Sequence, residues 1–167
     1  CVDNKPTTLF LIVMNDLNKL IELKSKCRKL YNIGKHSLHI SDYMEDTWRI
    51  GTSTLNVNSV HFLNNGTNDI SEKNKLLLIN YFNKIGKNNE DVCLTSSILM
   101  EMYGLRMAKD IDYLHKNNIE LQLKDVGLHS GKWENYYHKN KDEIIYNPEN
   151  HFYFNGFKCA TLNVVKK

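Results

Sequence analysis

Two aspartates near the middle of the chain, Asp110 and Asp112, are separated by a single apolar residue. They stand at the start of an apolar run, residues 110–114, that has the composition of a β-strand. Because side chains alternate along a strand, both carboxylates are expected on one face, roughly 6–7 Å apart. Such a pair suits a divalent cation, since Mg²⁺ binds one or two carboxylates and completes its shell with water and substrate phosphates. The spacing therefore predicts metal-assisted chemistry on phosphate groups.

A pair of serines precedes these aspartates by the length of a short helix. Ser96 and Ser97 follow the apolar run 92–94. Their hydroxyl and backbone N–H groups are expected near the start of a helix, where phosphate groups are commonly held. Arg106 follows Gly104 in the turn that leads to the aspartates. Together these residues are the parts of a site for phosphoryl or nucleotidyl transfer.

The order of these residues resembles the pattern of the nucleotidyltransferase superfamily, in its minimal, DNA-polymerase-beta-like form. In that pattern an apolar strand is followed by Gly-Ser or a similar small pair, a helix, an arginine in a turn, and Asp-x-Asp on the next strand. The matching positions in this chain are Ser96 and Ser97 for the small pair, with Ser96 in place of glycine, Arg106 for the arginine, and Asp110 and Asp112 for the aspartates.

The resemblance covers about residues 90–165. It includes a second stretch, Gly156-Phe157-Lys158 through Leu162, which is similar to a Gly-apolar-Lys turn that minimal nucleotidyltransferases place before a helix. The family's third carboxylate comes from a later strand, and Asp125 is the predicted counterpart because it ends the alternating run 119–124. Asp142 and Glu143 are the alternatives.

The resemblance implies that Mg²⁺ or Mn²⁺ is held by Asp110 and Asp112, and that Ser96, Ser97 and Arg106 bind a nucleoside triphosphate. A nucleotidyl group would pass to an acceptor whose identity the sequence does not indicate. Two other functions are compatible with the same residues. One is a catalytically inactive binding or scaffold module of the same fold, and the other is a glycosyltransferase module whose Asp-x-Asp holds the metal of a nucleotide-sugar.

Aromatic residues and histidines elsewhere are weaker indicators. Trp133, Tyr136 and Tyr137 are spaced as on one face of a short helix, which favours packing in the core over stacking on a nucleic-acid base. His129 and His138 lie in polar, loop-like sequence without the spacing of metal ligands.

Composition excludes several classes of protein. The chain has 167 residues, of which 41% are hydrophobic and 25% charged, and its net charge of +3 is spread over interleaved acids and bases, so it does not indicate nucleic-acid binding. Four widely spaced cysteines form no zinc motif, and Cys93 and Cys159 are expected to be buried, which indicates a reducing, cytoplasmic setting. The longest apolar run, residues 9–14, is too short to span a membrane.

The predicted fold class is α/β, with two parts. Residues 1–68 are expected to form a small α/β unit in which strands alternate with helices. The strands are predicted at 9–14, 37–40 and 59–63, one helix from Asn15-Asp16 to about Tyr31, and a second helix after Ser41-Asp42. Because the chain begins at Cys1 and stops directly after an apolar run, the sequence indicates a piece of a longer protein, whose other domains are expected partners.

Residues 69–167 are expected to form a nucleotidyltransferase-like α/β domain with a mixed sheet. A helix is predicted after Ser71, and strands are predicted at 91–94, 110–114 and 119–123. A β-hairpin is predicted around Asn155-Gly156, a dipeptide typical of two-residue turns.

Overall fold

A computed structural model describes residues 10, 12, 14–32, 34–41, 43–67, 69–86 and 89–165. Contacts within the chain divide it into two compact units, residues 1–48 and residues 49–167. Helix α2 (Met44–Thr54) crosses this division. The boundary predicted between residues 68 and 69 is therefore not where the contacts divide the chain.

The first unit contains one long helix, α1 (Leu17–Tyr31), as predicted. It begins at Asp16, whose carboxylate accepts hydrogen bonds from the backbone N–H groups of Asn18 and Lys19 and so satisfies two unpaired donors of the first turn. It ends at Asn32, which adopts a left-handed conformation (φ 52°). The short 3₁₀ helix η1 (Gly34–His36) follows.

The strands predicted at 37–40 and 59–63 are wrong. Residues 37–40 form no regular element, and neither do the described residues of the run 9–14, which are the exposed Phe10, Ile12 and Met14. The other residues of that run lie outside the described part. Residues 59–63 belong to a helix, α3 (Val57–Asn65), because the Asn56 side chain accepts from the backbone N–H of Ser59 and caps the helix.

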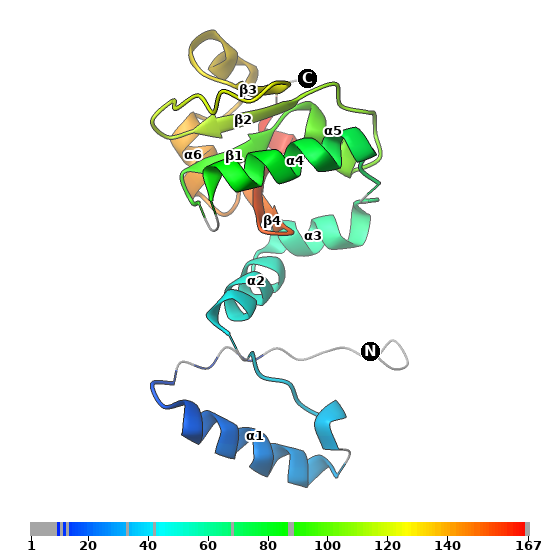
Figure 1. Ribbon diagram of the computed structural model, residues 1–167, viewed down its shortest axis with the longest axis vertical. Coiled ribbons are helices and arrows are strands. Elements are labelled where there is room, and N and C mark those ends of the chain that lie inside the picture. The colour runs from blue at the N-terminus through cyan, green and yellow to red at the C-terminus, as the bar shows by residue number, and fades with distance from the viewer. Residues whose placement is uncertain are drawn as a thin grey trace. The chain divides into compact units, whose positions relative to one another are not determined.

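The second unit is built on a five-stranded mixed sheet in the order β3-β2-β1-β5-β4 (Figure 1). Strand β1 is antiparallel to β2 and parallel to β5, β2 is parallel to β3, and β4 and β5 form an antiparallel hairpin. The strands are β1 (Val92–Thr95), β2 (Ile111–His115), β3 (Val126–Leu128), β4 (His151–Phe154) and β5 (Phe157–Ala160). The predicted α/β class with a mixed sheet is thus confirmed.

The predicted hairpin is also confirmed, and its turn residues Asn155 and Gly156 both have positive φ, 49° and 83°, as a type I′ turn requires. The strand predicted at 119–123 is wrong. Only Leu123 forms an isolated bridge, and the strand itself begins at Val126. The hydroxyl of Tyr113 bonds the backbone of Ile119 and Leu121 and so takes the place of a neighbouring strand there.

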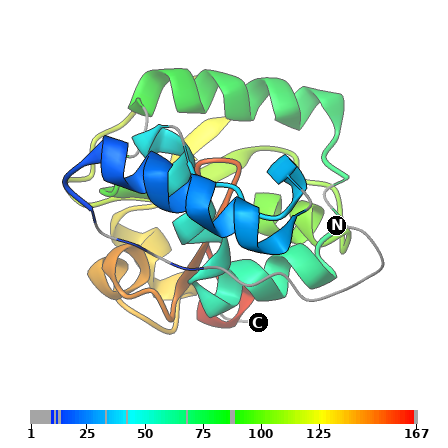
Figure 2. The ribbon, with the colours of Figure 1, turned by 90° about the horizontal axis from the view of Figure 1, so that it is seen from below.

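Helices pack on both faces of this sheet. Helix α4 (Glu72–Ile85) lies along one face and α6 (Lys141–Tyr146) lies on the other (Figure 1 and Figure 2). Helix α4 begins after Ser71 and ends at Gly86 (φ 80°), both as predicted. The remaining elements are α5 (Ser97–Met102), η2 (Gly131–Tyr136) and η3 (Leu162–Val164).

The core of the second unit lies between the sheet and these helices. Phe62 of α3 stacks on Phe152 of β4, with ring centroids 4.6 Å apart, so α3 belongs to this core. Cys93 and Cys159 are fully buried, as predicted. Other side chains with no exposed surface include Leu94, Ile98, Leu99, Met102, Ile111, Leu114, Ile144 and Ile145. Among the described residues, no helix has the length and apolar character needed to cross a membrane.

Candidate functional site

The pairing of β1 with β2 brings the serines beside the aspartates. Thr95, the last residue of β1, is paired with Asp112 near the beginning of β2. The turn after β1 therefore lies next to the residues that precede β2. The Ser97 hydroxyl donates to the backbone oxygen of Asp110, at 3.2 Å, and lies 3.5 Å from its carboxylate oxygen Oδ1. Residues separated by a whole helix in the sequence are thus in contact.

Ser96 has an unusual backbone conformation. It connects β1 to α5 with φ 61° and ψ −130°. This region is favourable for glycine and costs a residue with a Cβ atom on the order of 1–3 kcal/mol. The surrounding strand and helix hold Ser96 in this conformation, and backbone strain of this kind is concentrated at functional sites.

The carboxylate of Asp112 lies over a glycine of the neighbouring strand. Asp112 is paired with Gly127 of β3, and a Cβ atom on Gly127 would stand 3.3 Å from the Asp112 oxygen Oδ1. His129 is two residues further along and therefore shares this face of the sheet. Its Nε2 atom lies 3.2 Å from Asp112 Oδ1, with only 15% of the histidine side chain and 17% of the aspartate side chain exposed.

His129 was not indicated by the sequence. Its contact with Asp112 depends on the register between β2 and β3 and on the absence of a side chain at Gly127. The only signal in the sequence is the Gly-x-His spacing, which puts both residues on one face of a strand. That spacing becomes informative only when the partner strand is known.

The other ring nitrogen of His129 faces a buried phenol. The Tyr137 hydroxyl lies 2.5 Å from His129 Nδ1, and the Ser96 hydroxyl lies 3.4 Å from each of these two atoms. Burial raises the pKa of Tyr137 to about 12, so its hydroxyl is protonated at neutral pH. A protonated phenol can donate to Nδ1 or accept from it, so it can pair with either neutral tautomer of the histidine.

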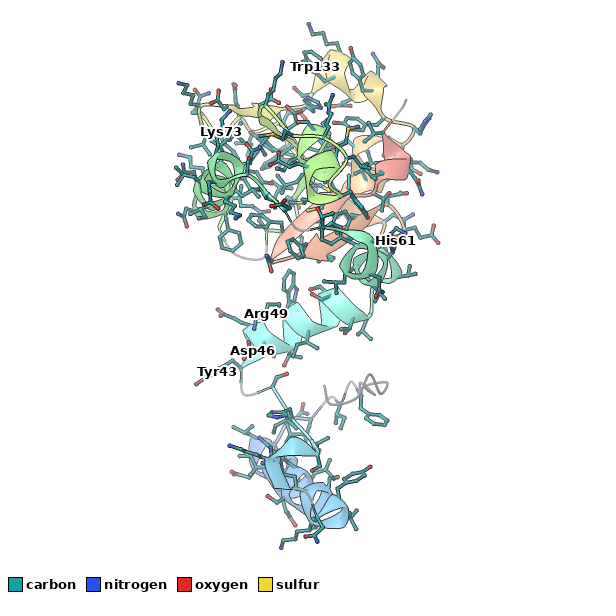
Figure 3. All side chains as sticks on the ribbon, turned by 90° about the vertical axis from the view of Figure 1, so that its right-hand side faces the viewer. Tyr43, Asp46, Arg49, His61, Lys73 and Trp133 are labelled. Atoms are coloured by element: carbon teal, nitrogen blue, oxygen red, sulfur yellow. The ribbon has the colours of Figure 1, made fainter. Side chains whose placement is uncertain are left out.

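Two aromatic rings extend outward from His129. Trp133 stacks on the imidazole, with centroids 5.5 Å apart and an interplanar angle of 10°, and Tyr136 stacks on Trp133 at 5.6 Å. Trp133, which η2 carries at the edge of the second unit, is 41% exposed, and Tyr136 is 55% exposed (Figure 3). The predicted core packing holds for Tyr137 alone, which is 4% exposed.

The remaining predicted site residues stand further from this group. Arg106 is exposed in the loop before β2. The backbone oxygen of Asp125 accepts from the N–H of Ile111, but its carboxylate lies 3.8 Å from Nζ of Lys73 on α4. Asp142 and Glu143 lie in the first turn of α6. In the described part of the chain, no three His, Cys, Asp or Glu side chains gather closely enough to hold a metal ion.

A buried carboxylate fixes the loop that carries Arg106. Glu101 of α5 is 4% exposed and accepts from Ser71 N (2.7 Å), Ala108 N (2.6 Å) and Asn74 Nδ2 (2.6 Å). Burial by itself would raise the pKa of Glu101, but these hydrogen bonds outweigh it and leave the pKa below its usual value. Glu101 thus ties the start of α4 and the loop before β2 to the helix that follows Ser96.

The second stretch of the resemblance has a structural role in this fold. Nζ of Lys158 donates to the backbone oxygens of Glu90 (2.7 Å) and Ile145 (2.9 Å) and pairs with the Glu90 carboxylate at 2.5 Å, with 3% of the lysine side chain exposed. These contacts use all three donors of the ammonium group. A 3₁₀ helix, η3, follows this stretch.

Comparison with known proteins adds no assignment: no protein-family model, curated protein or solved structure matches this chain. The functional interpretation therefore depends on the residues and the geometry described above.

Proposed function

We propose that residues 49–167 form a nucleotidyltransferase-type domain, which binds a nucleoside triphosphate with a divalent cation and transfers a nucleotidyl group to an acceptor hydroxyl. The observation that carries this proposal is the hydrogen bond from Ser97 to Asp110 beside the Thr95–Asp112 pair. It joins the small pair after one strand to the Asp-x-Asp at the start of its antiparallel neighbour. The order strand, small pair, helix, arginine and Asp-x-Asp is the order of the family pattern.

The backbone of Ser96 supports the same proposal. The family pattern has glycine at this position, and Ser96 adopts φ 61°, a conformation that favours glycine. The turn therefore has the shape that the glycine would give it, although the residue is serine. A Ser96 hydroxyl at this turn adds a donor that glycine does not have.

The residues present suit a divalent cation bound together with a nucleotide. Asp110 and Asp112 offer oxygen ligands at the same end of β2, and Mg²⁺ needs few protein ligands when phosphates supply the rest. When bound, the cation supplies positive charge that stabilises the phosphates during transfer. The exposed guanidinium group of Arg106 can form paired hydrogen bonds to a phosphate, and the hydroxyl groups of Ser96 and Ser97 can donate to one.

A third carboxylate is needed to accept the proton of the acceptor hydroxyl. In this proposal Asp125 has that role, since its backbone is bonded to Ile111 between the two aspartates. The contact of Asp125 with Lys73 does not prevent this, because the side chains are 42% and 56% exposed and exposed ion pairs of this kind are weak. If the domain binds a nucleoside triphosphate but transfers no nucleotidyl group, it is instead the catalytically inactive binding module of the same fold.

A melting experiment tests the proposal. Mg²⁺ or Mn²⁺ together with each of the four nucleoside triphosphates should stabilise the wild type, by about 2.7 kcal/mol at a ligand concentration ~100 times the dissociation constant. Asp112→Asn should remove this gain, whereas Glu149→Gln, a change of an exposed carboxylate distant in sequence, should retain it. If no combination stabilises the wild type, the proposal is wrong.

One observation favours a second candidate, a metal-independent acyl hydrolase. Ser96 stands on a strained strand-to-helix turn, its hydroxyl is 3.4 Å from His129 Nδ1, and His129 Nε2 is 3.2 Å from Asp112. A strained turn of this kind and the chain order Ser, Asp, His are those of α/β-hydrolases. We rank this candidate second because Tyr137, at 2.5 Å, is the nearer partner of Nδ1. Labelling of Ser96 by a fluorophosphonate in metal-free buffer, absent in Ser96→Ala and kept in Ser97→Ala, would favour it.

A further inference from the structure

We propose that His129 is a direct ligand, through Nε2, of the divalent cation held by Asp112, and that the site therefore prefers Mn²⁺ to Mg²⁺. This inference depends on the proposed function, because it concerns the same cation. The resemblance implies that the protein ligands of the ion are the oxygens of Asp110 and Asp112. The inference gives the ion instead one carboxylate oxygen, from Asp112, and the adjacent imidazole nitrogen of His129.

The two proposed ligand atoms are close enough to share one ion. Asp112 Oδ1 and His129 Nε2 lie 3.2 Å apart. Two ligand atoms that each lie about 2.1 Å from one ion, at angles near 90–110°, are separated by roughly 3 Å. The two atoms can therefore bind a common ion with little movement of either side chain.

Gly127 leaves space beside the Asp112 carboxylate. The Asp112 carboxylate lies over this residue, and a Cβ atom there would stand 3.3 Å from Asp112 Oδ1, the atom that His129 Nε2 contacts. A side chain at this position would thus crowd the carboxylate. Its absence leaves the two ligand atoms on a common, partly open face, where phosphates and water can complete the shell of the ion.

The surroundings of the His129 imidazole suit a metal ligand. A histidine that binds a metal through one nitrogen donates the N–H of the other to a fixed partner. Here the partner is the buried Tyr137 hydroxyl, 2.5 Å from Nδ1. Trp133 stacks on the ring at an angle of 10° and holds its plane. His129 is therefore oriented from two sides before any ion binds.

The preference for Mn²⁺ follows from the nitrogen ligand. Mg²⁺ is a hard ion that takes oxygen ligands, whereas first-row transition ions accept imidazole and bind a given site with affinities that increase from Mn²⁺ to Co²⁺. The described residues offer no group of three ligand side chains. With so few protein ligands, the imidazole nitrogen strongly affects the relative affinities for Mn²⁺ and Mg²⁺. Replacement of His129 by aspartate restores an all-oxygen pair and should bring the affinities for Mn²⁺ and Mg²⁺ together.

Pulsed electron paramagnetic resonance of Mn²⁺ tests the inference directly. The full chain is loaded with Mn²⁺, with and without inorganic tripolyphosphate, and the coupling of the ion to a ¹⁴N nucleus is measured. We expect this coupling in the wild type and in His138→Asn, which changes an exposed histidine nearby in sequence. We expect it to be absent in His129→Asp, although that variant still binds Mn²⁺. Tyr137→Phe should lower the affinity for Mn²⁺ about tenfold, because the outer partner of Nδ1 is lost.

The outcomes separate this inference from the proposed function. Binding of Mn²⁺ that depends on Asp112 but shows no ¹⁴N coupling overturns the role of His129 and leaves the proposed function standing. Coupling that persists in His129→Asp also overturns it, because another nitrogen is then the ligand. If Mn²⁺ does not bind under any of these conditions, both proposals are wrong.

Discussion

The two ends of strand β1 carry polar groups of very different kinds. Before its first residue, Glu90 and Lys158 form a network in which every donor of the buried ammonium group has a partner. After its last residue, Ser96 adopts a strained conformation, and Asp112 is only partly buried beside His129. Both ends contain charged groups at short range.

The two ends differ in how many of their polar atoms already have a hydrogen-bond or ion-pair partner. The ammonium group of Lys158 has no donor left for a ligand, and tyrosine rings cover it, with Tyr146 and Tyr153 centroids 5.7 and 5.8 Å from Nζ. A cavity of about 410 Å³ adjoins this network. At the other end, Asp110 is exposed, and the second carboxylate can accept further bonds. We infer that the first end stabilises the fold and that the second end binds a ligand.

The largest expected effect on stability is at the end of β1 where Lys158 pairs with Glu90. Lys158→Met should lower the free energy of unfolding by about 3 kcal/mol, because it removes the donor of two backbone carbonyl oxygens and the cation beside the Glu90 carboxylate, which keeps only the hydrogen bond from the Tyr153 hydroxyl. Lys84→Met, at an exposed position of α4, should change it by less than about 0.5 kcal/mol. Urea denaturation measures both. A loss in Lys158→Met no larger than that in Lys84→Met would remove the distinction between the two ends.

The second prediction concerns Glu101, which holds the loop before β2. Glu101→Gln should cost about 2 kcal/mol at pH 7, because three hydrogen bonds lose their charged acceptor. Since the pKa of Glu101 is lowered in the folded state, its contribution is complete above the unfolded value, near 4.5, and is lost as the pH falls through the folded value. The difference between wild type and variant should therefore narrow below pH 4.5, and a constant difference would contradict this assignment.

The third prediction concerns the strained backbone of Ser96 at the other end of β1. Ser96→Gly should raise the free energy of unfolding by about 1 kcal/mol, because glycine adopts φ 61° without strain. Ser96→Ala, which keeps the Cβ atom, should give no such gain. Nucleotide binding should survive in Ser96→Gly if the position corresponds to the family's glycine. A glycine variant less stable than the wild type would show that the turn is not strained.

The smallest effect on stability is expected at Gly127. Gly127→Ala should change the free energy of unfolding by less than about 1 kcal/mol, because alanine lowers the conformational entropy of the unfolded chain and this stabilisation offsets the close contact. It should nevertheless weaken binding of Mn²⁺, since the new methyl group displaces the Asp112 carboxylate. Gly51→Ala is the matched control, because its Cβ atom would meet only Leu55, at 4.0 Å. Equal Mn²⁺ affinity in both variants would contradict the proposed geometry.

Much of the fold could be predicted from local signals. Helices α1 and α4 have helical periodicity and recognisable ends, and the hairpin has Asn-Gly at its turn. The run Val60-His61-Phe62-Leu63 is too short for its period to distinguish strand from helix, and the cap at Asn56 decides the matter. Residues 119–123 alternate as a strand does, but the Tyr113 hydroxyl takes their hydrogen bonds.

The candidate site could be predicted only in part. The contact of Ser97 with Asp110 follows from a strand-helix-strand order that is visible in the sequence. The contact of His129 with Asp112 depends on strand register, which a short apolar strand without a buried and an exposed face does not specify. For the same reason, the sequence does not show that the carboxylate of Asp125 faces Lys73.

The most direct test of the proposed nucleotide site is calorimetric titration of the full chain with each nucleoside triphosphate in Mg²⁺ and in Mn²⁺. We expect the wild type to bind at one site, Asp112→Asn to lose this binding while it still folds, and Glu149→Gln, at an exposed glutamate outside the proposed site, to bind as the wild type does. Equal affinity in wild type and Asp112→Asn would contradict the site, and no binding by the wild type would contradict the proposed function itself.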